Sequence, residues 1–139
     1  MLHVLVIDRD HAVRSVFSLL LKGAGLRVSA VAAPREARHL FGETDVVVAD
    51  LADFGPQPRS RFLRELLRHE EVAVVAFAGE PHLRDVPVGS VDTWLAKPVT
   101  AEKLVEALRE ATRARVSRSC IRLTSRATGL SPTKVADAS

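Results

Sequence analysis

Short apolar runs alternate along the chain with stretches in which apolar residues recur every three or four positions. The runs are rich in valine and alanine, and several are apolar at consecutive positions, which is typical of strands buried on both faces. We therefore expect five strands, at residues 4–7, 27–31, 46–49, 72–77 and 93–96.

The stretches between these strands carry the spacing and the end signals of helices. Asp10 is placed to cap a first helix that ends near Gly23 and Gly25, and Pro34 suits the first position of a short second helix through Phe41. The third helix is expected to bury Phe62, Leu63, Leu66 and Leu67 and to expose Arg59, Arg61, Arg64 and Arg68. The last is expected to begin at an N-cap, Thr100, and to bury Leu104, Leu108 and Ala111.

This alternation of strands and helices is typical of βαβ units, so the fold class predicted is α/β, a three-layer α/β/α sandwich on a five-stranded parallel sheet. One step of the alternation is weak. Residues 79–90 hold Pro81, Pro87 and two glycines, so the helix expected there is reduced to a turn at most. We place the domain at residues 1–112.

Charge separates this domain from the end of the chain. From Arg113 onward there are six basic residues and one acid, so the isoelectric point near 9.6 comes from a basic tail on a mildly acidic domain. We expect little regular structure beyond Arg115 and a flexible tail over residues 113–139. A basic tail can contact nucleic acid, but the chain lacks a complete DNA-binding unit, so no autonomous nucleic-acid binding is expected.

Other features of the composition exclude several classes of protein. No apolar run is long enough to cross a membrane, and the N-terminus has no signal-peptide pattern, so we expect a cytoplasmic protein without membrane insertion. The single cysteine, Cys120, excludes an internal disulfide.

Charged residues follow three of the predicted strands. Asp8 comes directly after the first, Asp50 after the third, and Lys97-Pro98 follows the fifth. Because the carboxyl ends of parallel strands meet at one edge of a sheet, these side chains should converge. Two carboxylates and an ammonium could together hold a divalent cation and a phosphoryl group.

The order of elements and these strand-end residues resemble the receiver domain of bacterial two-component response regulators, over roughly residues 1–112. The resemblance implies a flavodoxin-like strand order of 2-1-3-4-5. It also implies that Asp50 is the phosphoacceptor, that Lys97 contacts the phosphoryl group and Trp94 is the aromatic switch, and that the Lys97-Pro98 peptide bond is cis. Asp8, Asp50 and the backbone carbonyl of Ala52 would hold Mg²⁺.

Two positions depart from the family pattern. Arg9 stands where a second carboxylate normally binds magnesium, and a guanidinium offers no oxygen ligand. Asp10 could substitute through a shifted loop. Ala78 stands where a Thr or Ser normally contacts the phosphoryl group. Magnesium binding is therefore expected to be weak or absent.

The leading interpretation is a single-domain response regulator that accepts a phosphoryl group on Asp50 from a histidine kinase or a phosphotransfer protein. It would not be an enzyme and would act on a downstream protein. The alternative is a phosphorylation-independent pseudo-receiver, a docking or homodimerisation module in which Arg9 and Lys97 neutralise Asp8 and Asp50 without metal. A metal-dependent phosphohydrolase is disfavoured, because Ala52 replaces its expected acid/base aspartate.

Overall fold

The sheet is five-stranded and entirely parallel, with the order β2-β1-β3-β4-β5. The computed structural model describes residues 1–77, 86, 87 and 89–127, and for residues 118–127 it describes the backbone only. The strands are β1 (His3–Ile7), β2 (Arg27–Val31), β3 (Val46–Asp50), β4 (Ala73–Phe77) and β5 (Thr93–Leu95). The predicted α/β class and strand order are confirmed.

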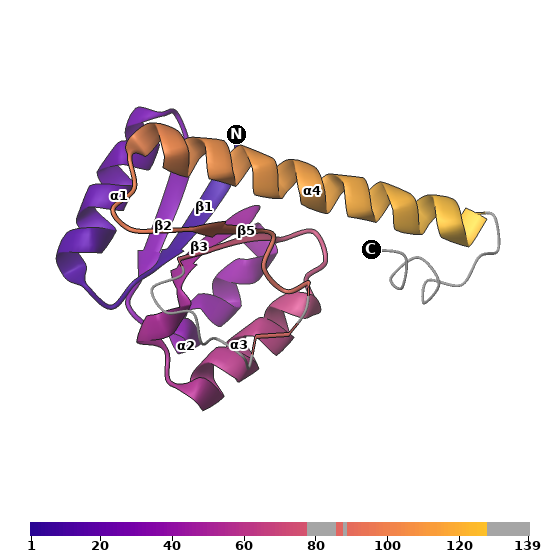
Figure 1. The fold of residues 1–139 in the computed structure, drawn as a ribbon, viewed down its shortest axis with the longest axis horizontal. Helices are drawn as coiled ribbons and strands as arrows, with labels where there is room; N and C mark the ends of the chain where they lie inside the picture. Colours follow the sequence, from indigo (N-terminus) through magenta and orange to yellow (C-terminus); the bar gives the residue numbers. More distant parts are fainter. Residues whose placement is uncertain (78–85, 88, 128–139) are drawn as a thin grey trace.

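Helices cover both faces of this sheet (Figure 1). On one face α1 (His11–Gly23) and α4 (Ala101–Ala127) pack against alternate strand residues such as Val4 and Val48. On the other, α2 (Pro34–Ala37), the 3₁₀ segment η1 (Arg38–Glu43) and α3 (Pro56–Leu67) pack against Leu5 and Val47. Since neighbouring residues point to opposite faces, each central strand must be apolar throughout.

The helix ends largely follow the signals in the sequence. Asp10 caps α1, with its Oδ1 accepting a hydrogen bond from the backbone N–H of Ala12 at 2.9 Å. Thr100 caps α4 by accepting one from the N–H of Lys103 at 3.2 Å. The expected burial of Leu67 is wrong, because its side chain lies at the exposed end of α3 and is 42% accessible.

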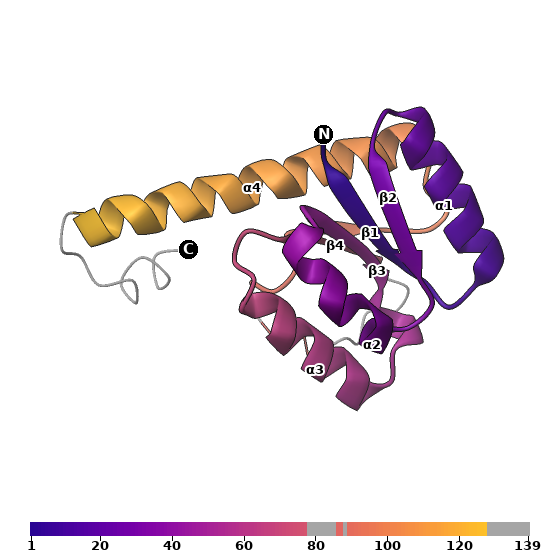
Figure 2. The ribbon, with the colours of Figure 1, turned by 180° about the vertical axis from the view of Figure 1, so that it is seen from behind.

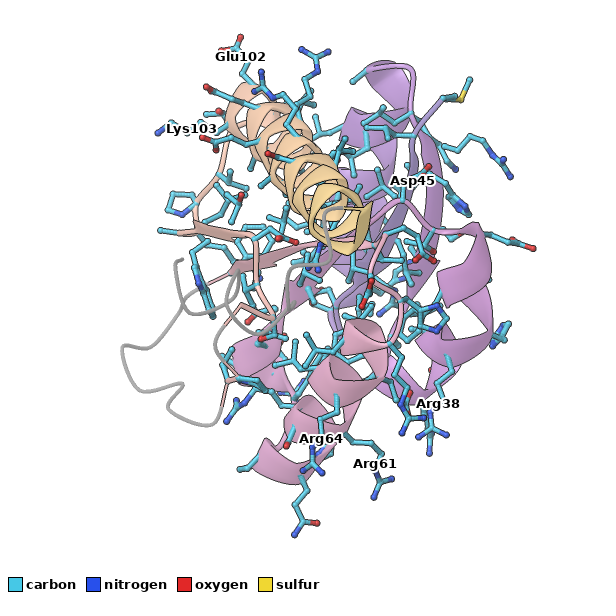
Figure 3. The ribbon with its side chains drawn as sticks, turned by 90° about the vertical axis from the view of Figure 1, so that its right-hand side faces the viewer. Arg38, Asp45, Arg61, Arg64, Glu102 and Lys103 are labelled. Carbon is cyan, nitrogen blue, oxygen red and sulfur yellow. The ribbon has the colours of Figure 1, made fainter. Side chains whose placement is uncertain are left out.

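The arginines of the third helix do not form one solvated face. Arg61 and Arg64 project away from the sheet beside Arg38 of η1 (Figure 3), and Arg38 pairs with Glu65 at 2.7 Å. Arg59, in contrast, is buried, and its Nη1 donates to the carbonyl of Leu51 at 3.0 Å.

The last helix is much longer than predicted. α4 continues to Ala127 and projects well beyond the sheet (Figures 1 and 2). The expectation of little regular structure after Arg115 is therefore wrong as far as Ala127. Arg115 itself is buried against Asp92, with a distance of 2.8 Å between Nη2 and Oδ2. The domain boundary after residue 112 stays a prediction, but α4 crosses it without a break.

The predicted reduction of the helix between β4 and β5 falls mainly on residues 78–85 and 88, which lie outside the described residues, as does Ala78. In the described part of the chain, no helix is both long and apolar enough to span a membrane.

Candidate functional site

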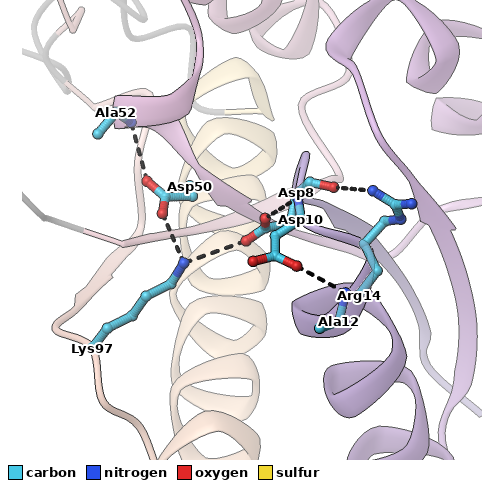
Figure 4. A network of polar contacts seen from close by, with 7 residues as sticks. All are labelled: Asp8, Asp10, Ala12, Arg14, Asp50, Ala52 and Lys97. Atoms are coloured by element: carbon cyan, nitrogen blue, oxygen red, sulfur yellow. Dashed lines mark hydrogen bonds and ion pairs between the residues drawn. The ribbon is translucent and has the colours of Figure 1, made fainter.

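The three strand-end residues meet as the sequence predicts. β1 and β3 are paired neighbours, with Ile7 opposite Ala49, so Asp8 and Asp50 follow at the same level of the sheet. Lys97, just beyond β5, reaches across to both (Figure 4). Its Nζ lies 2.8 Å from Oδ2 of Asp50 and 3.3 Å from Oδ2 of Asp8. The ammonium thus links two carboxylates that would otherwise repel each other.

The side chain of Lys97 gets there by passing over β4. Its Nζ lies 5.1 Å from the ring centroid of Phe77, the last residue of that strand, at the distance of a cation–π contact. The Lys97-Pro98 peptide bond is cis, as the resemblance implied.

Backbone and side-chain hydrogen bonds fix the position of Asp8, which is 3% exposed. Its Oδ1 accepts from the backbone N–H of Asp10 at 2.9 Å, which leaves Oδ2 for Lys97. Arg14 of α1 donates from Nη1 to the carbonyl oxygen of Asp8 at 2.7 Å. This contact of Arg14 could not be predicted from the sequence, because it depends on how α1 packs beside β1.

Asp50 is held less tightly and is more accessible. Its Oδ1 accepts from the backbone N–H of Ala52 at 3.2 Å, while Oδ2 faces Lys97. Its side chain is 13% exposed, against 4% for that of Asp8. One of the two carboxylates can therefore be reached from solvent, and it is the one at the predicted phosphoacceptor position.

A third carboxylate, which the sequence analysis did not identify, completes the cluster. Asp53 lies at the end of η2 (Leu51–Asp53), a single 3₁₀ turn that follows Asp50. Side chains three residues apart eclipse each other in such a turn, so Asp53 comes back over Asp50. Carboxylate oxygens of Asp8, Asp50 and Asp53 all lie within 4.8 Å of one another.

The electrostatics reflect this crowding of negative charge. Burial raises the pKa of Asp53 above its usual 3.8, and the charges of Asp50 and Asp8 raise it further, against the lowering effect of Lys97 and Arg9. For Lys97, burial lowers the pKa, but the hydrogen bond and charge of Asp50 and then of Asp8 outweigh it. The pKa of Lys97 is therefore raised above its usual 10.5, and Lys97 remains an ammonium at neutral pH.

Arg9 and Asp10, the residues at and beside the first departure, stand apart from the cluster. Arg9 is exposed and has no ion pair or hydrogen bond with the described residues. Asp10 uses Oδ1 to cap α1, and the metal-compatible group found in the described residues does not include it. The expected neutralisation of the site thus involves Lys97 but no contact from Arg9.

The donor set fits a magnesium ion. Asp8, Asp50 and Asp53 present only carboxylate oxygens, the ligands that Mg²⁺ prefers, and a cation already lies between two of them in the form of the Lys97 ammonium. Ala52 lies beside Asp50, and the use of its carbonyl as a ligand stays a prediction. Trp94 on β5 is 44% exposed, and its switch role likewise stays a prediction.

No family model and no curated protein matches this chain, but many solved structures do. A response regulator receiver domain protein from Clostridium thermocellum is 24% identical over 83% of this chain and 97% of its own, with a TM-score of 0.66. The chemotaxis protein CheY4 of Vibrio cholerae is 23% identical over 80% and 98%, with a TM-score of 0.67. A CheY-like receiver domain protein from Methanospirillum hungatei is 18% identical over 84% and 98%, with a TM-score of 0.71. The chain has the fold of response regulator receiver domains.

Proposed function

We propose that this chain is a receiver-like signalling protein in which Asp50 accepts a phosphoryl group and which acts through contacts with other proteins. The observation that carries the proposal is the contact between Asp50 and Lys97, at 2.8 Å, on the carboxyl edge of a receiver-type sheet. A nucleophilic carboxylate, its neutralising cation and two further carboxylates occur together there.

The chemistry requires a carboxylate that can be approached in line. An oxygen of Asp50 would attack the phosphorus of a phosphohistidine on the donor protein, forming a P–O bond as the P–N bond breaks. The bonding electrons leave with the imidazole nitrogen, which takes up a proton from solvent. Lys97 would then pair with the phosphoryl oxygens. A bound Mg²⁺, held by the carboxylates, would supply the further positive charge that offsets repulsion between donor and acceptor.

The donor would be a histidine kinase or a histidine phosphotransfer protein, and the output would be binding to a protein target. α1 is a candidate contact surface, because it begins beside Asp8 and exposes two large apolar side chains further along. Val16 is 53% exposed and Leu19 is 75% exposed. Exposed apolar side chains of this size on one helix favour a protein partner.

Covalent labelling tests the proposal directly. The protein would be incubated with Mg²⁺ and a small phosphoryl donor, such as acetyl phosphate or phosphoramidate, and its intact mass measured. We expect the mass of one added phosphoryl group, lost in Asp50→Asn. Asp45→Asn is the matched control, because Asp45 is an exposed aspartate directly before the start of β3, whereas Asp50 is at its end (Figure 3).

The second candidate is the phosphorylation-independent pseudo-receiver, a docking or dimerisation module. Arg9 and Ala78 favour it from the sequence, and the Lys97 bridge between Asp8 and Asp50 favours it as well, since it places one positive charge between the two carboxylates without metal. An unmodified mass at saturating donor and Mg²⁺, from protein that is folded, would make this the better proposal.

A further inference from the structure

We propose that the groove between α2, η1 and α3 binds an acidic segment of a partner protein, with one apolar side chain of that segment seated in the groove. The groove has a volume of about 330 Å³ and lies in the layer that covers the Leu5 side of the sheet, opposite α1 and α4. This surface is separate from the one that the proposed function assigns to α1, and its use does not require phosphorylation of Asp50.

The floor of the groove is apolar and rigid. It is lined by Pro34 at the start of α2 and by Pro58 and Phe62 of α3. The ring of Phe62 is fixed by two aromatic neighbours, with centroid distances of 5.8 Å to Phe41 and 5.3 Å to Phe54. The volume is at the lower end of the range for small-molecule pockets, about 300–1,000 Å³, so the groove suits one apolar side chain better than a larger ligand.

The rim of the groove is cationic. Arg35 and Arg38 line it on one side and Arg61 on the other. Among the described residues that line it, Glu65 is the only acid, and it is already paired with Arg38 at 2.7 Å. Arg35 and Arg61 are exposed and make no ion pair or hydrogen bond with the part of the chain that the structure describes. Two guanidiniums are therefore available for an external anion.

The positive charge continues beyond the groove along α3. Arg64 and Arg68 follow Arg61 at intervals of three and seven residues, on one side of the helix, and line an adjoining hollow with it. Arg61 and Arg64 project at the same corner of the molecule as Arg38 (Figure 3). Five arginines against one glutamate repel one another, so this surface is complementary to a segment that carries several negative charges.

The combination of rim and floor favours a peptide over a nucleic acid. Guanidinium groups bind carboxylates through two parallel hydrogen bonds, and arginine is enriched at protein interfaces. Single-stranded nucleic acids need exposed aromatic rings on which bases stack, and the ring that lines this groove, that of Phe62, is only 2% exposed. The phosphates of a duplex would use the arginines alone. An acidic segment with an apolar residue uses both parts of the groove.

The test selects ligands without assuming their sequence. Random peptides displayed on phage would be selected on the full wild-type chain and on Arg35→Glu/Arg61→Glu, which reverses the two unpaired charges. Arg27→Glu/Arg109→Glu is the matched control, because both arginines are exposed and neither lines the groove. Thermal unfolding would verify that each variant is folded. The most enriched peptide would then be labelled and titrated by fluorescence anisotropy, beside versions in which its acids become amides or its apolar residue becomes serine.

We expect the wild type and the control to enrich peptides with several acidic residues around an apolar one. Affinity for the selected peptide should fall at least about tenfold in the groove variant and with each altered peptide, because few contacts dominate such interfaces. Enrichment of peptides without acidic residues, no enrichment at all, or equal affinity for the groove variant would overturn the proposal. Binding of a labelled DNA oligonucleotide that only the groove variant loses, without acidic peptides, would overturn it in favour of nucleic acid. The mass increase at Asp50 tests the proposed function separately.

Discussion

Arg115→Ala should destabilise the protein strongly, although this residue lies beyond the end of the domain that the sequence predicts. The side chain of Arg115 is 8% exposed and that of Asp92 is fully buried, and Nη2 lies 2.8 Å from Oδ2. The same Oδ2 accepts from the backbone N–H of Val74 at 2.8 Å. The pair therefore ties α4 to the start of β4 and to the residue that precedes β5.

The magnitude follows from the burial of Asp92. Removing one partner of a buried ion pair costs about 3–5 kcal/mol, because the remaining charge keeps its desolvation penalty and loses its counterion. The N–H of Val74 still donates to Asp92 in the variant, so we expect a loss of about 3 kcal/mol. For a chain of this size that lowers the melting temperature by about 10 °C.

Urea unfolding followed by circular dichroism would measure the free energy of unfolding of three variants. Arg115→Met retains most of the apolar stem and separates lost charge from lost packing. Arg113→Ala, at an exposed position on the same helix, should stay within about 0.5 kcal/mol of the wild type. Shortened chains would add a second readout, since a chain ending at Thr112 should be less stable than one ending at Ser117.

A loss below about 0.5 kcal/mol in Arg115→Ala, the range of surface substitutions, would refute the reasoning. Equal stability of the two shortened chains would refute it independently. Either result would mean that α4 contributes no packing energy beyond Thr112, and the predicted boundary there would be right.

Three further predictions concern the site. The raised pKa of Lys97 means that its ion pairs stabilise the folded state fully below pH 10.5, the pKa of an unfolded lysine, and that this stabilisation is lost as the pH rises through the pKa of the folded state. The wild type should therefore lose stability above pH 10.5. Lys97→Met should lack this loss when both are unfolded in urea between pH 9 and 11.5. Arg9→Asp should raise the affinity for Mg²⁺ about tenfold in calorimetric titration, because it exchanges a repelling charge for an oxygen ligand; unchanged affinity would show that position 9 does not influence the ion. Asp53→Asn should unfold at a higher temperature than the wild type when metal is removed by a chelator, because it removes a partly desolvated charge and its repulsion with Asp50 and Asp8, the two causes that raise the pKa of Asp53. A lower melting temperature would contradict this.

The sheet and its helices could be predicted because burial on both faces makes each central strand apolar throughout, and this pattern is visible without the structure. Convergence of Asp8, Asp50 and Lys97 followed from parallel geometry alone, since all three follow strands of one sheet. Both results depend on local pattern plus one general rule of topology, and neither needs the position of a particular side chain.

The length of α4 could not be predicted in the same way. Arg115 continues the spacing of Leu104, Leu108 and Ala111 along one side of the helix, but an arginine at a core position looks like the end of the packed stretch. Its acceptor, Asp92, lies 23 residues earlier in the sequence, just before β5, and approaches Arg115 only in the folded chain. Asp53 was missed for a related reason, because its approach to Asp50 requires η2 to be a 3₁₀ turn.

The two departures from the receiver pattern, Arg9 and Ala78, therefore differ in their expected effect on the site. Arg9 removes a ligand, yet it does not fill the site, since it is exposed and pairs with none of the three described carboxylates. Asp53 brings a third carboxylate within 4.8 Å of Asp8 and Asp50, so the cluster stays rich in negative charge although position 9 is an arginine. For Ala78 the described residues at the cluster offer no such replacement, because neither Lys97 nor the backbone N–H of Ala52, already bonded to Asp50, supplies a hydroxyl. We therefore expect that Asp50 can accept a phosphoryl group and that this phosphorylation has little effect on the environment of Trp94. Phosphorylation of Asp50 with an unchanged tryptophan fluorescence would be the signature of that separation, and a large fluorescence change on phosphorylation would show that transmission does not need the hydroxyl.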